Sequence, residues 1–401
     1  MTIEDARSND MFGASSNQTS PVKVMIIGVG GGGSNAVDNM ISAGVRVDTF
    51  MAINTDRQAL RLSKAKTRIQ IGSKITKGFG AGANFEVGQK AAEESREILA
   101  NLIKEKDLVF ITAGMGGGTG TGAAPVIAQI AHELDKLVLA FVTTPFKFEG
   151  EKRMRNAEIG IMNLRKHVDS LILIPNEQLA AVAKDMTTQD AFKYADDVLR
   201  QGVQAITDLI MNPGKINVDF ADIRTVLKNG GDSFMGIGRA SGEKRAIEAV
   251  TRAVNNAILN VSIEGATQVI VNVEGKDARM DEVNRAVDLV KDICSPDANI
   301  IFGMGFVPAL EDEIQVTVIA TGFNKTAAAA ANAVMLGKTP PQVAAPEPPP
   351  MPAPPQPHQQ SFFAPPPPQP IQPPQPQPRR KGYVSLDDDI EDSWLRRLNN
   401  K

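Results

Sequence analysis

Two glycine-rich segments carry the residues best suited to bind phosphate groups. In the first, Gly28, Gly30 and Gly33 form a G-x-G-x-x-G pattern that runs from an apolar segment into Ser34 and Asn35. Glycines let the backbone turn tightly and present consecutive N–H donors, and a helix that begins there adds positive charge at its N-terminus. We therefore predict an anion site here, although the pattern alone favours a dinucleotide site and also fits a tight turn without a ligand.

The second glycine loop covers residues 113–122 (AGMGGGTGTG) and follows another apolar segment, Leu108–Thr112. Thr119 and Thr121 add hydroxyl donors to it. Two helix N-termini directed at one crevice hold more than one phosphate group, and each hydrogen bond to a charged phosphate contributes about 1.5–3 kcal/mol. A nicotinamide-dependent oxidoreductase needs only the first loop, so the pair favours a nucleoside triphosphate. A flexible hinge is the alternative for this loop.

The usual sequence patterns for reading the nucleotide are absent. Neither glycine loop ends in the Gly-Lys-Ser/Thr of a P-loop, and Gly337-Lys338-Thr339 has Asn332 where the first glycine of that motif belongs. Residues 324–327 (NKTA) lack the acid of a guanine-reading Asn-Lys-x-Asp pattern. Asp48 and Asp56 lie near the spacing of a ribose-binding acid, so spacing alone leaves the oxidoreductase alternative open.

A pair of carboxylates, Asp219 and Asp222, is the second feature able to do chemistry. The two acids are three residues apart at a predicted helix start, so both can point the same way. Acids near a helix N-terminus are stabilised there, and simple capping is the alternative explanation. The pair follows the long predicted helix, on its far side from the glycine loops, so it could not easily reach a phosphate bound in the same subunit.

Alternating strands and helices must position these groups. The α/β alternation predicts a parallel sheet covered on both faces, with ligands bound beyond the carboxyl ends of its strands. A long helix, with Asp190 as its N-cap and Asn212-Pro213-Gly214 as its end, would span about 30 Å between two domains. An ordinary covering helix of the first sheet is the alternative. The predicted strands of the sheet are Val22–Ile27, Asp48–Ile53, Leu108–Thr112, Leu137–Thr143 and Ser170–Ile174.

The chain after the long helix predicts a smaller α+β unit. Its expected elements are helices at Glu243–Leu259 and Asp281–Ile293, strands at Thr267–Val273, Asn299–Phe306 and Glu313–Ala320, and a last helix at Thr326–Met335. The predicted units are a disordered tail (1–20), a nucleotide-binding domain (21–189), the central helix (190–213), an α+β domain carrying the carboxylate pair (214–325), an Ala-rich segment with a Pro-rich linker (326–382) and a tail peptide (383–401).

Composition excludes several classes of protein. The formal net charge of −3 argues against a nucleic-acid binder that works through a basic surface field. The single cysteine, Cys294, excludes a disulfide framework, and no run of apolar residues is long enough to span a membrane. Nineteen of the 26 prolines lie between Pro340 and Pro378, which predicts an extended, disordered linker. We expect a cytoplasmic protein.

The loop Gly116–Gly122 (GGGTGTG) resembles the signature loop of the tubulin and FtsZ superfamily. Residues 30–35, 54–56 (NTD), 75–84, 145–150 and 217–222 (NVDFAD) extend the likeness over about three quarters of the chain. The resemblance implies a Rossmann-like GTPase domain with a parallel sheet, a long central helix and a smaller α+β domain that completes the active site of the neighbouring subunit. It also implies head-to-tail filaments that form the contractile ring at the midcell division site of a bacterium.

The resemblance implies roles for individual residues in GTP and GDP binding. Phe192 would stack on guanine and Asp196 would accept hydrogen bonds from its N1–H and amino group, with a solvated helix acid as the alternative for Asp196. Glu149 and Arg153 would lie near the ribose and phosphates, although a plain surface pair has the same spacing. The full predicted set is Gly31, Gly32, Gly33, Ser34, Asn35, Ala81, Gly82, Ala83, Gly117, Gly118, Thr119, Gly120, Glu149, Arg153, Asn176, Phe192 and Asp196.

The resemblance also assigns a role to the carboxylate pair. Asp219 and Asp222, assisted by Asn217, would enter the next subunit's nucleotide site and position the attacking water. Mg²⁺ would accompany the nucleotide, because the sequence offers no metal-binding cluster of its own.

The last segment of the chain resembles a peptide that binds partners of the family. Asp389, Ile390, Trp394, Leu395, Arg396 and Arg397 stand in register with that peptide, whereas Asp392 and Ser393 depart from it. The expected partners are division proteins and membrane tethers, bound through a short helix or strand. We expect no nucleic-acid partner and no direct membrane insertion.

Overall fold

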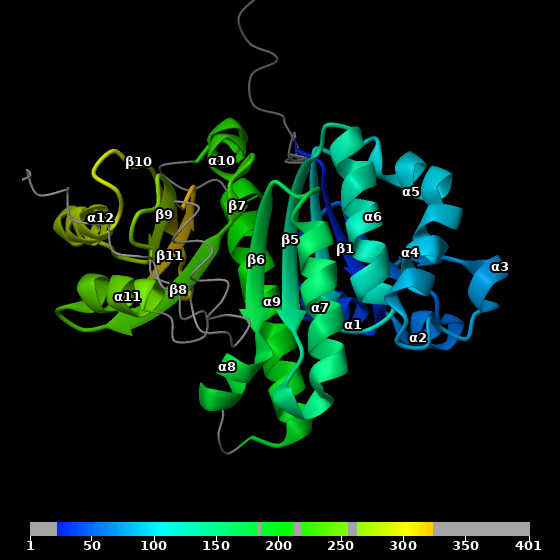
Figure 1. The fold of residues 1–401 in the computed structure, drawn as a ribbon. Coiled ribbons are helices and arrows are strands. Elements are labelled where there is room, and N and C mark those ends of the chain that lie inside the picture. Colours follow the sequence, from blue (N-terminus) through cyan, green and yellow to red (C-terminus); the bar gives the residue numbers. More distant parts are fainter. Residues whose placement is uncertain (1–21, 183–185, 212–217, 256–262, 324–401) are drawn as a thin grey trace, which may run out of the picture. The chain divides into compact units, whose positions relative to one another are not determined.

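A computed structural model describes residues 22–182, 186–211, 218–255 and 263–323 of the chain. Its first sheet has seven strands in the order β3-β2-β1-β4-β5-β6-β7, and every neighbouring pair is parallel (Figure 1). The strands are β1 (Val24–Val29), β2 (Thr49–Asn54), β3 (Thr67–Gln70), β4 (Leu108–Gly114), β5 (Leu137–Thr144), β6 (Ser170–Pro175) and β7 (Gly231–Asp232).

The central strands form where the sequence has runs of aliphatic residues. All side chains of β1, β5 and β6 are buried, as a parallel sheet covered on both faces requires. Along β1 the side chains alternate between two cores: Val24 and Ile26 belong to one, and Met25 and Ile27 to the other. The predicted Rossmann-like parallel sheet is therefore confirmed.

Helices cover both faces of this sheet. α1 (Gly30–Ser42) contributes to the core on the side of Ile26, and α4 (Phe85–Glu94), α5 (Arg96–Ile103), α6 (Thr119–Glu133) and α7 (Glu151–Leu164) contribute to the core on the side of Ile27. The remaining helices of this part are α2 (Arg57–Leu62), α3 (Ser73–Thr76), α8 (Asn176–Val182) and the short 3₁₀ helix η1 (Lys147–Glu149).

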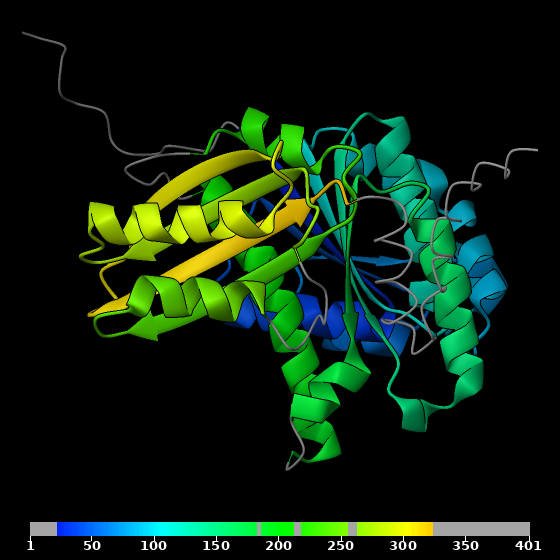
Figure 2. The ribbon, with the colours of Figure 1, turned by 60° about the vertical axis from the view of Figure 1, so that its left-hand side comes forward.

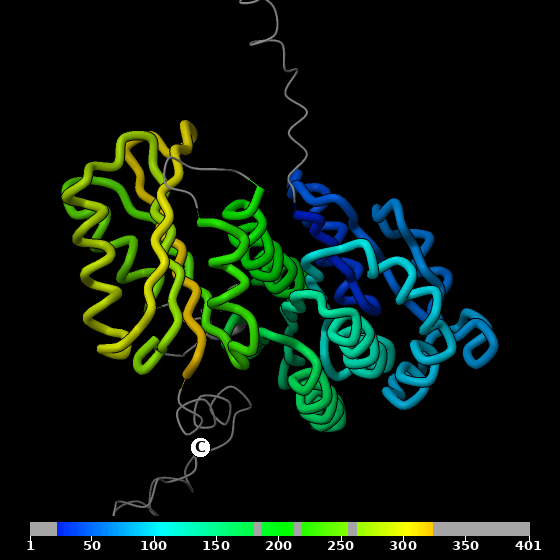
Figure 3. Tube along the Cα trace, turned by 90° about the horizontal axis from the view of Figure 1, so that it is seen from above, coloured from blue at the N-terminus to red at the C-terminus, as the bar shows by residue number. Residues whose placement is uncertain are grey.

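The long central helix is α9 (Thr188–Met211), whose 24 residues span about 36 Å. It begins before Asp190 because the Thr187 hydroxyl accepts a hydrogen bond from the Asp190 N–H at 3.2 Å and takes over the predicted capping role. A Cβ on Gly202 would stand 2.7 Å from the Phe141 ring of β5 and 3.6 Å from Met235 of the second sheet. α9 therefore lies between the two sheets (Figures 1 and 3), and its predicted end at Asn212 falls outside the described residues.

The second sheet is smaller and mixed, with the order β10-β9-β11-β8. β10 and β9 are parallel, whereas β11 runs antiparallel to β9 and to β8. α11 and α12 lie side by side in front of the strands of this sheet in Figure 2. α10 comes before the sheet in the chain. The bounds are α10 (Phe220–Leu227), β8 (Phe234–Ser241), α11 (Arg245–Val254), β9 (Gln268–Gly275), α12 (Met280–Ile293), β10 (Asn299–Phe306) and β11 (Glu313–Thr321). The predicted α+β unit is confirmed.

The sequence did not predict three of the described strands, β3, β7 and β8. β8 was not predicted because Gly236 and Gly238 interrupt its apolar pattern. A Cβ at Gly236 would stand 1.9 Å from the Ala253 carbonyl oxygen, and one at Gly238 2.0 Å from that of Ala249, so the strand needs glycine to lie close against α11. β3 and β7 are short and lie at the two edges of the sheet.

Other expectations concern residues that the structure does not describe. The N-terminal tail, Asn217, the Ala-rich run, the proline linker and the tail peptide all lie outside the described residues. Among the helices of the described part, none is long and apolar enough to cross a membrane.

Candidate functional site

A pocket of about 320 Å³ opens beyond the carboxyl ends of the strands of the first sheet. β1 passes directly into α1 at Gly30, and β4 leads through a turn into α6 at Thr119, so two helix N-termini meet at the same edge. The end of β5 and the first turns of α9 supply further parts of the wall. The lining residues are Gly31, Gly32, Asn35, Gly114, Met115, Gly117, Gly118, Thr119, Gly120, Thr143, Thr144, Pro145, Glu149, Arg153, Asn176, Phe192, Ala195 and Asp196.

Some glycines of the two loops are required by packing. A Cβ on Gly33 would stand 2.2 Å from the Thr112 carbonyl oxygen, and one on Gly120 would stand 2.7 Å from that of Gly114. A Cβ on Gly118 would stand 2.8 Å from the Ala81 side chain. Close contact with neighbouring backbone or side-chain atoms therefore explains these three glycines.

Gly31 and Gly117 differ from those glycines because a Cβ at either position would meet no atom within 4 Å. Both residues line the pocket. A side chain at either position would extend into open space at the pocket, where a bound ligand would need to approach the backbone. The arrangement fits a phosphate chain held by backbone N–H groups.

The two threonines of the second loop have different positions. Thr119 lines the pocket, and its hydroxyl lies 2.7 Å from the hydroxyl of Thr55, with which it shares a hydrogen bond. Thr121 is buried, and its hydroxyl accepts the Gly116 N–H at 2.8 Å. Thr121 therefore stabilises the loop and does not line the pocket.

The Phe192 ring lines the pocket where α9 begins, and the rings of Phe146 and Phe148 pack against it. The Phe192 ring meets the Phe146 ring edge-on with centroids 5.0 Å apart, and Phe146 stacks on Phe148 at 5.1 Å. Phe146 is buried, whereas Phe192 remains 41% exposed. Phe192 is thus a supported ring with a free surface on which a planar group can stack.

Asp196, one turn along α9 from Phe192, lines the same wall. Burial raises the pKa of its carboxyl group to about 7, because the charged form loses hydration there. No hydrogen-bond or ion-pair partner is found for this carboxyl group among the described residues. The Asn176 side-chain oxygen is likewise buried without a hydrogen-bond partner. Two polar groups at this wall are therefore available to a ligand.

Glu149 and Arg153 form an ion pair at the rim of the pocket. Glu149 ends η1 and also accepts the Phe146 N–H at 3.0 Å, whereas Arg153 belongs to α7. Gly150, with φ of 96°, separates the two helices. The pair therefore closes a corner of the pocket and is not a pair along one surface helix.

Five of the predicted nucleotide-binding residues do not line the pocket. Gly33 is buried beneath the first loop, and the buried Ser34 hydroxyl has no hydrogen-bond partner among the described residues. Ala81 is buried next to Gly118, whereas Gly82 and Ala83 are exposed. The other 12 predicted residues line the pocket.

Sequence reasoning missed several lining residues. Thr143 and Thr144 end β5, and Pro145 follows them. Their presence could have been inferred from the apolar strand ending in two hydroxyl residues, because ligands of parallel sheets bind at that end. Met115 and Ala195 also line the pocket, but neither belongs to a polar pattern from which this could have been predicted.

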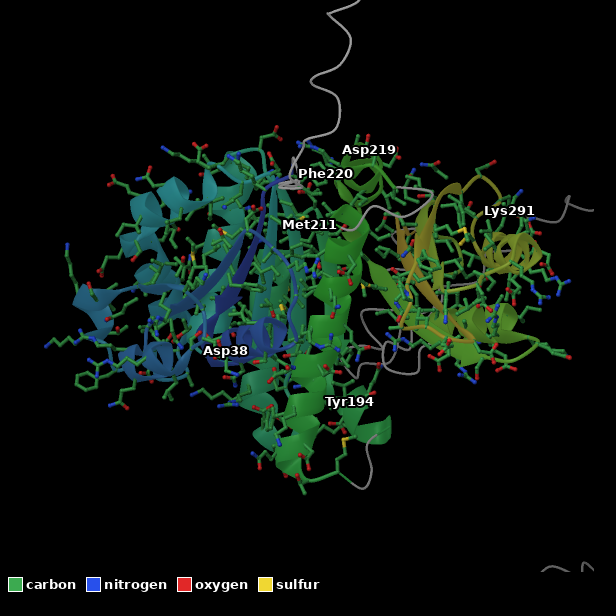
Figure 4. The ribbon with its side chains drawn as sticks, turned by 180° about the vertical axis from the view of Figure 1, so that it is seen from behind. Asp38, Tyr194, Met211, Asp219, Phe220 and Lys291 are labelled. Atoms are coloured by element: carbon green, nitrogen blue, oxygen red, sulfur yellow. The ribbon has the colours of Figure 1, made fainter. Side chains whose placement is uncertain are left out.

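The carboxylate pair lies away from the pocket. Asp219 caps α10 by accepting the Ala221 N–H at 3.4 Å, so the capping explanation accounts for this residue in part. Asp219 and Asp222 are both exposed, and neither lines the pocket. Figure 4 places Asp219 near Met211 at one end of α9, with Tyr194 toward the other end. Tyr194 directly precedes the pocket residues Ala195 and Asp196 in the chain.

No group of three or more His, Cys, Asp or Glu side chains within the described segments is arranged to hold a metal ion. The pocket lining offers backbone N–H groups and the hydroxyl groups of Thr119, Thr143 and Thr144, and within the described segments it holds no cluster of three or more carboxylates. This donor set fits a divalent cation that arrives on phosphate oxygens better than one held by the protein alone.

Comparisons with known proteins agree with this arrangement. Residues 23–184 match the "Tubulin/FtsZ family, GTPase domain", and residues 231–324 match the "FtsZ family, C-terminal domain". An empty FtsZ dimer from M. jannaschii is 43% identical, with a TM-score of 0.72 over 76% of this chain and 89% of that one. A second FtsZ structure from the same organism has the same identity and TM-score over 75% of this chain and 91% of that one.

A more distant structure shares the fold. A protofilament of CetZ2 from Haloferax volcanii with bound GTPγS is 19% identical, with a TM-score of 0.65 over 79% of this chain and 97% of that chain.

Proposed function

The chain belongs to the tubulin/FtsZ family of GTPases, and from that premise we propose that it is a GTP-dependent, self-assembling cytoskeletal protein. Its subunits join head to tail into filaments that form the contractile ring, the Z ring, at the bacterial division site. Each subunit hydrolyses GTP to GDP and phosphate at its contact with the next subunit.

One observation carries this proposal: two complementary sets of polar groups lie at opposite ends of α9. The pocket with Phe192 and Asp196 lies at the start of the helix, and the exposed Asp219 follows its end (Figure 4). The helix is about 36 Å long, so the carboxylates of one subunit cannot serve its own pocket. A head-to-tail contact brings the two sets together, and such a contact repeats without closing.

The base end of the pocket supports guanine recognition. Asp196 is a partly buried carboxyl group, and the guanine N1–H and amino group are two adjacent donors from which its ionised form would accept hydrogen bonds. Adenine has an acceptor at N1 in place of the N1–H and would leave the carboxylate unpaired. Phe192 would stack on the base, and Asn176 would supply a further polar contact.

The phosphate chain would lie along the two glycine loops. Backbone N–H groups of Gly31 and Gly32, at the start of α1, and of Gly117 to Gly120 would hold it, with the Thr119 hydroxyl as an additional donor. The loop Ala81–Ala83 would face the γ-phosphate, and Glu149 with Arg153 would contact the ribose and phosphates. Mg²⁺ bound with the nucleotide would neutralise negative charge on the phosphates.

Hydrolysis would be completed by the neighbouring subunit. Asp219 and Asp222, with Asn217, would orient and polarise the water that attacks the γ-phosphate. Phosphoryl transfer depends mostly on positioning and electrostatics, so a site completed by contact makes assembly the activating step. The tail peptide with Trp394 would connect the filament to division proteins and membrane tethers in the cytoplasm at midcell.

The test is phosphate release by the purified protein against protein concentration, with GTP and ATP in parallel and light scattering on the same samples. We expect turnover per subunit to rise above a threshold concentration, with GTP only and together with scattering. Turnover independent of concentration would contradict the shared active site. No GTP turnover would favour a passive filament, that is, a nucleotide-binding structural filament with little hydrolysis.

Replacing Asp219 by alanine separates the enzyme from a passive filament. We expect filaments without turnover. Filaments with unchanged turnover would show that the catalytic assignment is wrong.

A further inference from the structure

We propose that Thr321 and Ser170 are positioning residues for the carboxylate pair of α10, because their hydroxyl groups hold the C-terminal end of that helix against both sheets. The inference rests on the proposed function, since it concerns how Asp219 and Asp222 are presented to a neighbouring subunit.

α10 is short and has different surroundings at its two ends. Its eight residues span about 12 Å and behave as one rigid rod. Asp219 and Asp222 are exposed at the N-terminal end, whereas Val226 and Leu227 are buried at the C-terminal end. A tilt at the buried end therefore displaces both carboxylates.

Side-chain hydroxyl groups bind the last carbonyl groups of α10. The Val226 carbonyl accepts a hydrogen bond from the Thr321 hydroxyl, and the Leu227 carbonyl accepts one from the Ser170 hydroxyl, both at 2.8 Å. The last four carbonyl groups of a helix have no partner within it, and elsewhere water often fills this role. Here the two donors are completely buried, so water does not replace them.

The two hydroxyl groups come from different sheets. Ser170 is the first residue of β6 in the first sheet, and Thr321 is the last residue of β11 in the second. Gly230 lies between them, where no side chain fits: a Cβ there would stand 2.9 Å from the Ser170 hydroxyl oxygen and 3.0 Å from the Thr321 Cβ. The end of α10 is thus fixed where the two sheets meet, so a shift between the sheets would change the direction of the helix.

The buried Asp169 reinforces the first-sheet side of this junction. Its carboxylate accepts the Asn229 N–H at 3.3 Å and the Val138 N–H of β5 at 2.9 Å. Leu227 also accepts the Gly230 N–H at 3.2 Å, so its carbonyl keeps one donor when the Ser170 hydroxyl is removed. We therefore expect loss of the Thr321 hydroxyl to have the larger effect.

The first experiment compares Thr321→Val, which removes the hydroxyl and keeps the side-chain shape, with Thr321→Ser, which keeps the hydroxyl. We expect Thr321→Val to lower kcat for GTP about ten-fold with unchanged GTP affinity, because small displacements of catalytic groups have large effects on rate. The kcat of Thr321→Ser should stay within about two-fold of the parent value, because the hydroxyl that donates to the Val226 carbonyl is retained. Thr251→Val is the matched control, because its hydroxyl donates to the Ile247 carbonyl on the exposed side of α11.

The second experiment mixes variant subunits and measures turnover. Gly117→Val blocks the pocket and keeps α10 intact, whereas Asp219→Ala keeps the pocket and lacks a carboxylate. If Thr321→Val misplaces α10, adding Gly117→Val restores turnover, because an intact α10 then serves the open pocket of the Thr321→Val subunit. Adding Asp219→Ala does not restore it. The reverse pattern, or equal rescue by both, would show that Thr321 supports the pocket and would overturn the proposal.

A control mixture separates this inference from the proposed function. Gly117→Val and Asp219→Ala together should regain turnover if the site is shared between subunits. Without that gain the shared site is wrong and the positioning role fails with it. If that gain is seen but Thr321→Val has the parent kcat, the positioning role alone is wrong. Should Thr321→Val fail to fold by circular dichroism, Ser170→Ala takes its place in the same mixtures, with the same outcomes decisive.

Discussion

The glycines of the first glycine-rich segment fall into two groups according to what a side chain at each position would meet. A Cβ on Gly28 would stand 2.4 Å from the Gly33 carbonyl oxygen, which belongs to the backbone and cannot move aside. A Cβ on Gly31 would meet nothing within 4 Å. The first glycine is required for folding, and the second leaves room for a ligand.

We predict opposite consequences for Gly28→Ala and Gly31→Val. Gly28→Ala should lower the free energy of unfolding by about 2–3 kcal/mol, because the added methyl group strains a packed backbone. Gly31→Val should keep the free energy of unfolding within about 1 kcal/mol of the parent and weaken GTP binding at least about ten-fold. Urea unfolding and nucleotide titration measure the two quantities. A Gly31→Val protein that binds GTP normally would contradict the placement of the phosphates.

Asp196 predicts a dependence of GTP binding on pH. Its pKa of about 7 lies above the usual 3.8, so much of this carboxyl group is neutral below pH 7 in the free protein. Accepting two guanine donors requires the ionised form, so GTP affinity should rise as the pH increases from 6 to 8. Asp196→Asn should lose about ten- to one-hundred-fold in affinity. The GTP affinity of this variant should change with pH only as far as the ionisation of the nucleotide itself requires. Measuring the GTP affinity of both proteins from pH 6 to 8 tests this.

The raised pKa of Asp196 also makes the free energy of unfolding depend on pH. The folded protein retains the Asp196 proton to higher pH than the unfolded chain, so this group lowers the free energy of unfolding as the pH rises from about 4 to 7. Without nucleotide, Asp196→Asn should therefore be more stable than the parent at pH 8, by about 1–2 kcal/mol after allowing for partial exposure. Equal pH profiles of unfolding for the two proteins would contradict the burial of this carboxyl group.

At the scale of elements, a buried arginine joins the two helices of the second sheet. Arg245 begins α11, and its guanidinium binds Glu282 of α12 at 2.8 Å and Asp277 at 2.9 Å. Its side chain is only 5% exposed, whereas the neighbouring Asp312 is 80% exposed. The contact to Glu282 is thus the buried part of this cluster, and it holds the pKa of Glu282 below its usual value.

Removing this arginine should destabilise the second sheet and its helices. Arg245→Ala leaves the Glu282 carboxylate without its main partner, and we expect the free energy of unfolding to fall by about 2–4 kcal/mol at pH 7. Because the pKa of Glu282 is lowered in the folded state, the loss should shrink as the pH falls below about 4.5. The control is Glu248→Gln on the same helix, because it removes only the exposed ion pair with Arg252, which should contribute less than about 0.5 kcal/mol.

At the scale of the molecule, α9 connects the two sheets through close packing. One apolar core contains side chains of β1, α9 and the second sheet together. Gly202 is a point of close contact between α9 and β5, because a Cβ there would stand 2.7 Å from the Phe141 ring. The helix is therefore too close to β5 for a side chain at this position.

Gly202→Ala should push α9 away from β5. We expect the free energy of unfolding to fall by about 1–3 kcal/mol, because the extra methyl group overpacks this core. Lys193→Ala, an exposed position on the same helix, should change it by less than about 0.5 kcal/mol. Thermal unfolding of both variants checks the prediction, and equal stability would show that the helix can move at no cost.

Local patterns in the sequence determined much of the fold and part of the site. Aliphatic runs predicted the strands β1, β4, β5 and β6, because a parallel sheet buried on both faces leaves little choice of residue. The glycine loops predicted an anion pocket, since a strand that turns into a helix through glycines has few other uses. β8 was missed because its glycines interrupt the apolar pattern, and their need for close contact with α11 appears only when the strand and the helix pack together.

Only the tertiary structure decided which of these groups meet. It brought Thr143 and Thr144 into the pocket, because neighbouring strands end at one edge, and it left Ser34 buried outside the lining. It placed Asp219 and the pocket at opposite ends of α9, and it joined Ser170 and Thr321 at the end of α10. Ser170 and Thr321 are 151 positions apart in the chain, so their contact with one helix depends on how the two sheets pack.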